Sequence, residues 1–177
     1  RPLPWASIDN DDTRDIDQLT LAAEAVTGAR VFVAIADVDA LVPLDSDIDL
    51  HASHNTVSVY TPARTFPMLP ERLSTGLTSL HEGKDRLAVV VEMRVEEDGT
   101  VSTARLFRAA VHNHARLTYD AVAAWLEGRG PLPRGAEGLE GQLRLQEETA
   151  GRLRLRRHER GALRFDTVRT QAVIEDG

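Results

Sequence analysis

The chain has 177 residues, of which 42% are hydrophobic and 28% are charged; this composition suits one folded domain and disfavours a disordered chain or a coiled coil. The 28 acidic residues outnumber the 21 basic ones, which argues against a protein that coats nucleic acid through bulk positive charge. Because cysteine is absent, disulfides, thiolate metal sites and cysteine nucleophiles are excluded, and a cytoplasmic location is expected. No apolar run approaches the roughly 18 residues of a membrane helix, so no membrane partner is expected.

From the N-terminus, the sequence predicts two paired strands, a short helix and a third strand. The apolar segments 19–26 and 30–36 flank a turn that contains Gly28, which predicts a β-hairpin. Residues 46–54 open with a serine and early acidic residues, the pattern of a capped short helix. The alternation of polar and apolar residues over 56–60 predicts a half-buried strand.

The middle of the chain predicts a loop of fixed shape and a second, longer hairpin. Two prolines within residues 66–71 exclude regular structure and impose an extended, bent path. Asp98-Gly99 lies between the β-rich runs 85–94 and 101–111, which is a strong local signal for a hairpin.

The last third predicts a helix, a Gly- and Pro-rich loop, a longer helix and two strands, over residues 119–126, 128–134, 137–159, 162–165 and 170–174 respectively. Gly161 is expected to end the longer helix. Long hairpins followed by segregated helices indicate an α+β fold rather than alternating parallel α/β units.

The most unusual feature of the sequence is a cluster of five aspartates in one short segment: Asp9, Asp11, Asp12, Asp15 and Asp17. Close carboxylates repel one another unless a cation compensates them. Hard oxygen ligands at short spacing suit Mg²⁺, Mn²⁺ or Ca²⁺. The alternative is a solvated acidic loop whose aspartates cap turns.

Two other motifs overlap this segment. A calcium loop that starts at Asp9 would need Gly where Arg14 stands and Glu where Thr20 stands, which excludes it. The order Asp9-x-Asp11-x-Thr13 also fits the nucleophile motif of haloacid-dehalogenase-like phosphatases. That motif should follow a buried apolar strand, whereas residues 1–5 contain two prolines, so the fit to the phosphatase motif is weak.

The segment from Ser7 to Gln18 resembles the acidic signature of the ribonuclease II and ribonuclease R family, whose catalytic module is the RNB domain. Other family blocks follow in order: Ala34-Ile-Ala-Asp37-Val38, Ser58-Val-Tyr60, Pro67-Met-Leu-Pro70, Leu73-Ser74, Ser79-Leu80, Asp85-Arg-Leu87, Leu117-Thr-Tyr119, Arg160-Gly-Ala-Leu163 and Phe165. The resemblance implies an RNB-domain-like α+β fold, a mainly antiparallel sheet with packed helices. Residues 1–177 would be the N-terminal part of an exoribonuclease catalytic domain, a partial domain.

The resemblance also implies an activity, because enzymes of this family are metal-dependent 3′→5′ exoribonucleases that release nucleoside 5′-monophosphates from single-stranded RNA. By motif position, Asp9, Asp15 and Asp17 would be catalytic and metal-binding, and Gln18 would be the fourth metal position. The implied cofactor is Mg²⁺, for which Mn²⁺ can substitute. Gln18 stands where the family usually has Asp, so weaker metal binding is expected, and a non-catalytic RNA-binding derivative is the alternative.

Three aromatic residues match RNA-contacting positions of the family. Tyr60 and Phe165 match residues that stack on bases, and Tyr119 matches the tyrosine that seats the last nucleotide near the metal. Such stacking contributes about 1–3 kcal/mol per base without sequence preference. Read without the resemblance, Phe165 is a core residue and Tyr119 an amphipathic packer. The implied partners are the 3′ end of single-stranded RNA, the remaining half of the catalytic domain, and oligonucleotide-binding-fold domains in the parent protein.

Two histidines form a weaker candidate site. His112 and His114 are two residues apart, so on a strand they share one face and could chelate an ion. No carboxylate or third histidine stands nearby in the sequence to complete a metal site, so metal binding is not expected there.

Overall fold

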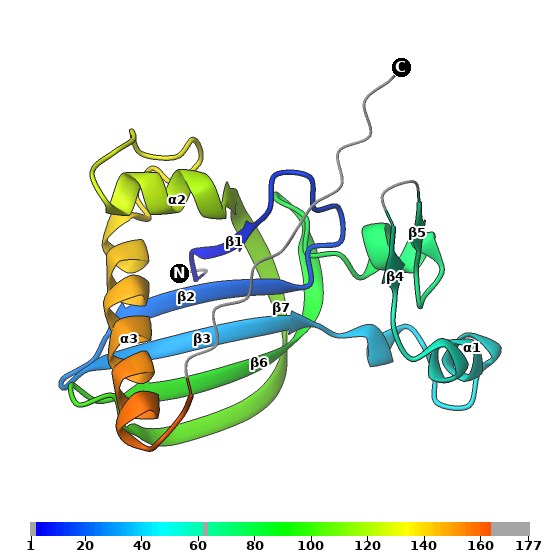
Figure 1. Ribbon diagram of the computed structural model, residues 1–177. Helices are drawn as coiled ribbons and strands as arrows, with labels where there is room; N and C mark the ends of the chain where they lie inside the picture. Colours follow the sequence, from blue (N-terminus) through cyan, green and yellow to red (C-terminus); the bar gives the residue numbers. More distant parts are fainter. Residues whose placement is uncertain (1–2, 62–63, 164–177) are drawn as a thin grey trace.

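A closed β-barrel is the centre of the computed structural model, which describes residues 3–61 and 64–163 (Figure 1). Around the barrel the strands follow the order β1 (Trp5–Asp9), β2 (Gln18–Glu24), β3 (Ala29–Ala36), β6 (Asp85–Val95) and β7 (Val101–Thr118). Strands β1 and β7 pair in parallel, and the other neighbouring pairs are antiparallel. The expected α+β class with a mainly antiparallel sheet is therefore confirmed.

Both predicted hairpins are present. Gly28 and Gly99 occupy their turns with φ of 67° and 77°, backbone angles at which a Cβ atom is disfavoured. The second strand of the longer hairpin extends beyond the predicted residue 111 to Thr118. It does so because its first part pairs with β6 and its last part pairs with β1, which closes the barrel.

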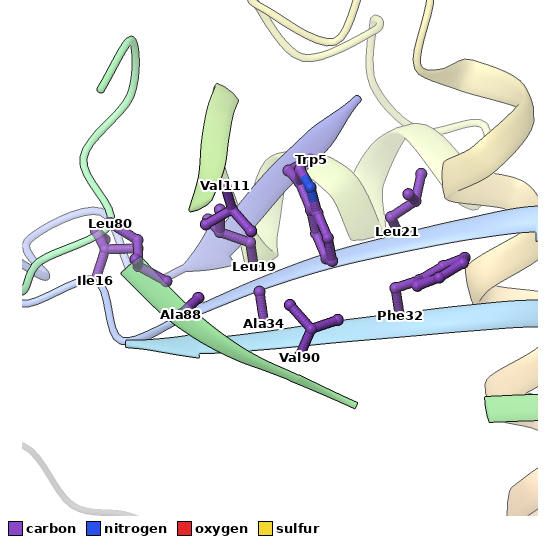
Figure 2. Close-up of a cluster of buried hydrophobic side chains, with 10 residues drawn as sticks. All are labelled: Trp5, Ile16, Leu19, Leu21, Phe32, Ala34, Leu80, Ala88, Val90 and Val111. Atoms are coloured by element: carbon purple, nitrogen blue, oxygen red, sulfur yellow. The ribbon is translucent and has the colours of Figure 1, made fainter. Parts of the chain in front are cut away.

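The barrel interior is a continuous apolar core, shown in Figure 2. It is formed by Trp5, Ile16, Leu19, Leu21, Phe32, Ala34, Leu80, Ala88, Val90 and Val111. The rings of Trp5 and Phe32 meet edge to face, with their centroids 6.2 Å apart. Because side chains alternate along a strand, Leu19 and Leu21 enter this core while Gln18 and Thr20 lie on the outer face of β2.

Two helices, α2 (Tyr119–Leu126) and α3 (Glu140–Glu159), cover one side of the barrel (Figure 1). They bury a second apolar cluster, which includes Ala6, Ala115, Leu117, Val122, Leu139 and Leu143. Helix α3 begins three residues after the predicted position, because Gly138 has a φ of 82°, which a right-handed helix does not accommodate. Among the described residues, no helix has the length and apolar character needed to cross a membrane.

The remaining elements lie on the other side of the barrel (Figure 1). They are the short 3₁₀ turn η1 (Val38–Ala40), helix α1 (Asp47–Asn55), the two-stranded sheet of β4 (Val59–Tyr60) and β5 (Thr65–Phe66), and the π-helical turn η2 (Leu73–Leu77). The α1 prediction is confirmed, with the Ser46 side chain accepting a hydrogen bond from the Asp49 amide.

Two strand predictions differ from the structure. Of the strand expected over 56–60, only Val59–Tyr60 forms, and both residues are exposed because β4 pairs only with the short β5. At the C-terminal end, Ala162 and Leu163 form no strand, and the rest of the predicted segments 162–165 and 170–174 lies outside the described residues.

Candidate active site

The segment with the five aspartates, residues 9–17, is called the acidic loop below. It connects β1 to β2 at one end of the barrel (Figure 1). Asp9 is the last residue of β1 and Gln18 is the first residue of β2. Asp9 lies opposite Thr118 of β7, and Gln18 lies opposite Ile35 of β3. The barrel therefore fixes both ends of the segment that carries Asp15 and Asp17.

Two of the predicted carboxylates have defined hydrogen-bond partners. One oxygen of Asp9 accepts from the Asn10 amide at 2.7 Å and from the Thr13 hydroxyl at 2.9 Å. Asp15 accepts a hydrogen bond from the Tyr60 hydroxyl at 3.3 Å. The structure thus joins two predicted site residues that are 45 positions apart in the sequence.

The charges of Asp9 and Asp15 act on Asp17. Burial raises the pKa of Asp17, a hydrogen bond from its own backbone amide opposes that rise, and the negative charges of Asp9 and Asp15 raise it further. The pKa of the Tyr60 hydroxyl is also raised, first by partial burial and then by the charge of Asp15, so this group remains a hydrogen-bond donor at neutral pH. A cation bound between the carboxylates would offset their mutual repulsion.

The donor chemistry of these residues fits a hard divalent cation. Carboxylate oxygens of Asp9, Asp15 and Asp17 and an amide oxygen of Gln18 are ligands that Mg²⁺ accepts. In the part of the chain that the structure describes, no three His, Asp or Glu side chains are close enough to hold an ion by themselves. Mg²⁺ commonly binds through one or two carboxylates and completes its coordination with water and substrate phosphates, so the donor set remains compatible with it.

Gln18 and Tyr119 both line a separate feature, a cavity of about 520 Å³ between the outer face of the barrel and helices α2 and α3. Its walls are mostly apolar side chains, among them Ile8, Val122, Leu126 and Leu143. The predicted site residues therefore form two groups: the aspartates with Tyr60, and Gln18 with Tyr119. Phe165 lies outside the described residues, so its predicted role remains a prediction.

Sequence reasoning assigned no role to two residues that contact the acidic loop. The Ser79 hydroxyl accepts from the Ile16 amide, and the Arg116 guanidinium donates to the carbonyl groups of Asp11 and Thr13. Ser79 belonged to a family block, but the block did not show what the residue contacts. Arg116 carried no sequence signal, because it binds backbone atoms that every residue type provides.

The two histidines have a partner that the sequence did not reveal. Asp85 lies opposite His112 in the β6–β7 pair, and its carboxylate is 2.7 Å from His112 Nδ1. The ring of His114 lies 4.8 Å from that of His112, centroid to centroid. Because no metal-binding group of three occurs among residues 3–61 and 64–163, this arrangement gives no support to a metal site.

Comparison with known proteins gives one consistent family. The model of the RNB domain matches residues 1–177. Ribonuclease R of Vibrio parahaemolyticus is 40% identical over 175 residues, a match that covers 98% of this chain and 21% of the relative. Exoribonuclease 2 of Edwardsiella piscicida is 36% identical over 150 residues, which covers 84% of this chain and 23% of the relative. The chain thus spans between a fifth and a quarter of the length of these relatives.

A solved structure agrees with the sequence matches. RNase R of Mycoplasma genitalium, in complex with ribose methylated single-stranded RNA, superimposes with a TM-score of 0.92 at 30% identity. The superposition covers 98% of this chain and 27% of that chain. Because the RNB match extends along the whole chain, the phosphatase interpretation of Asp9 and Asp11 is not favoured.

Proposed function

Because the chain belongs to the RNB domain family, we propose that the protein carrying it is an exoribonuclease that shortens single-stranded RNA from the 3′ end. The observation that carries the proposal is the acidic loop, in which Asp9, Asp15 and Asp17 occupy the signature positions and the charges of the first two act on the third. The relatives that match almost the whole chain are ribonucleases R, and one was solved with single-stranded RNA.

The proposed cofactor is Mg²⁺, with Mn²⁺ as a substitute, held by Asp9, Asp15 and Asp17. Gln18, which lines the separate cavity, is the fourth metal position that the resemblance implies. When bound, such an ion supplies Lewis acidity, which activates water and offsets charge on the scissile phosphate. The carboxylates supply charge and geometry. Tyr60 orients Asp15 through its hydroxyl group, and because the residue is 68% exposed, its ring is available to stack on a base. For Tyr119 the proposed role is contact with the terminal nucleotide, and its 49% exposure beside the cavity supports this role.

The test is the decay of 5′-labelled single-stranded RNA by the natural polypeptide that contains this sequence, with Mg²⁺, with Mn²⁺ and with a chelator. We expect stepwise shortening that requires the metal and is lost in Asp17→Asn. Asp11→Asn is the matched control, because it removes the same charge from the same loop outside the three signature positions. Activity that survives in Asp17→Asn, or that falls equally in both variants, would contradict the assignment.

A non-catalytic RNA-binding protein is the second candidate, and the observation that favours it is Gln18 at a position where an acid is expected. If the wild-type protein retards RNA without shortening it, Gln18→Asp distinguishes the two functions. Restored shortening would show an enzyme weakened at its metal site. RNA binding without shortening in both proteins, independent of metal, would establish the binding function.

A further inference from the structure

The backbone between Asp15 and Asp17 is held by a second segment of the chain. The Ile16 amide donates to the Ser79 hydroxyl oxygen at 3.0 Å, and the Ile16 carbonyl accepts from the Leu80 amide at 2.8 Å. Ser79 is only 1% exposed, and its hydroxyl group donates onward to the Arg14 carbonyl at 3.4 Å. Both backbone groups of the residue between the two carboxylates are therefore fixed.

The first half of the acidic loop is held from a different direction. Arg116, near the end of β7, donates from Nη2 to the Asp11 carbonyl at 2.6 Å and to the Thr13 carbonyl at 2.9 Å. The Thr13 hydroxyl in turn donates to Asp9. Arg116 and Ser79 therefore restrain the two halves of the loop, and each acts mainly through backbone atoms.

The segment that carries Ser79 is itself tied to the barrel. Asn113 of β7, which is fully buried, donates to the Leu80 carbonyl at 2.8 Å. Arg86 of β6 donates to the Ser79 carbonyl at 3.1 Å. The position of the Ser79 hydroxyl is consequently set by two barrel strands.

We propose that Ser79 is a positioning residue, which together with Arg116 holds the acidic loop in the shape that binds the divalent cation. This inference rests on the proposed function. Asp9, Asp15 and Asp17 are like charges within one short segment, so an unrestrained loop would let them separate when no cation is bound. By limiting that separation, the two contacts reduce the rearrangement that metal binding requires.

The variants that test this are Ser79→Ala, which removes the buried hydroxyl group, and Arg116→Gln, which shortens an exposed side chain and leaves the core intact. Thr78→Val is the matched control: Thr78 is also buried, and its hydroxyl donates to the Leu73 carbonyl at 2.9 Å instead of to the acidic loop. In the natural polypeptide, we expect both test variants to raise the Mn²⁺ concentration for half-maximal RNA shortening about 10-fold, the lower end of effects seen for groups that orient metal ligands. KM for RNA should stay unchanged, excess Mn²⁺ should restore the rate, and Thr78→Val should behave as wild type.

Two measurements do not depend on activity. Mn²⁺ binding, followed by electron paramagnetic resonance without RNA, should weaken in Ser79→Ala and Arg116→Gln, and amide hydrogen exchange should accelerate in residues 10–17. If Ser79→Ala fails to fold, Arg116→Gln gives the decision. Unchanged Mn²⁺ affinity in a folded test variant, or an equal loss in Thr78→Val, would overturn the inference. A wild-type protein without ribonuclease activity that Gln18→Asp does not restore would refute the proposed function alone, because the Mn²⁺ binding comparison would still decide whether Ser79 positions the loop.

Discussion

Ile16 links the stability of the barrel to the acidic loop, so its truncation is the sharpest test of the fold. Its side chain is 1% exposed and lies in the barrel core, while its neighbours in sequence are two of the predicted metal ligands. Ile16→Ala removes three buried carbon atoms and should destabilise the barrel by about 3 kcal/mol; Ile16→Val removes one and should cost about 1 kcal/mol. Because every 1.4 kcal/mol is tenfold in an equilibrium constant, amides that exchange through barrel opening should exchange roughly 100-fold faster in Ile16→Ala.

Hydrogen exchange of β2 and β3 in the natural polypeptide measures this loss locally, without assuming that a long chain unfolds in one step. Ile48→Ala is the control, since Ile48 of α1 is partly exposed outside the barrel core and the same substitution there should change stability by less than about 0.5 kcal/mol. Ile16→Val keeps the backbone bonds to Ser79 and Leu80, so its Mn²⁺ requirement should match wild type. An exchange rate in Ile16→Ala within threefold of wild type would refute the placement of this side chain in the core.

Three further predictions concern other parts of the chain. Gly28→Ala would place a Cβ atom 2.0 Å from a carbonyl oxygen of β6 at a φ of 67°, so it should destabilise the first hairpin by more than about 1 kcal/mol. Amide hydrogen exchange in β2 and β3 measures this loss, and wild-type exchange rates would contradict the prediction. Hydrogen bonds from Arg30 and Arg105 hold the pKa of Glu92 below its usual 4.5 despite partial burial. The contribution of Glu92 to stability is therefore present above pH 4.5 and is lost as the pH falls through the lower pKa of the folded state. Glu92→Gln should flatten the acid limb of a curve of stability against pH, and an unchanged acid limb would contradict this prediction. Tyr60→Phe removes the hydroxyl bond to Asp15 but keeps the ring, so kcat should fall while RNA affinity is retained. An unchanged kcat would show that the hydroxyl bond to Asp15 is not needed and that Tyr60 acts only through its ring.

The hairpins could be predicted because their signals are local. Gly28 and Gly99 mark turns between apolar runs that pair directly with one another. Closure of the barrel could not be predicted, because β1 is five residues long and pairs in parallel with residues more than 100 positions away. No turn signal accompanies such a long-range pairing. The same absence explains why β7 was predicted too short.

The acidic residues of the candidate site could be predicted from the resemblance, but the contacts that hold them could not. The resemblance located Asp9, Asp15 and Asp17, and the structure adds that Tyr60 reaches Asp15. The restraints from Ser79 and Arg116 escaped prediction, because backbone carbonyl and amide groups accept and donate in the same way whatever the residue type. A contact of this kind becomes visible only when the fold brings the two segments together.

Gln18 shows how these restraints and the charge of the loop act together. Asp17 already carries the repulsion of two neighbouring carboxylates, and an acid at position 18 would add a further negative charge beside it. Gln keeps an oxygen donor and removes that charge, so the metal-free loop needs less restraint from the barrel. The same change lowers the electrostatic attraction for a cation. Gln18→Asp should therefore have two effects: Mn²⁺ should bind more tightly, and hydrogen exchange in the metal-free loop should become faster. A purely solvated acidic loop would show neither effect.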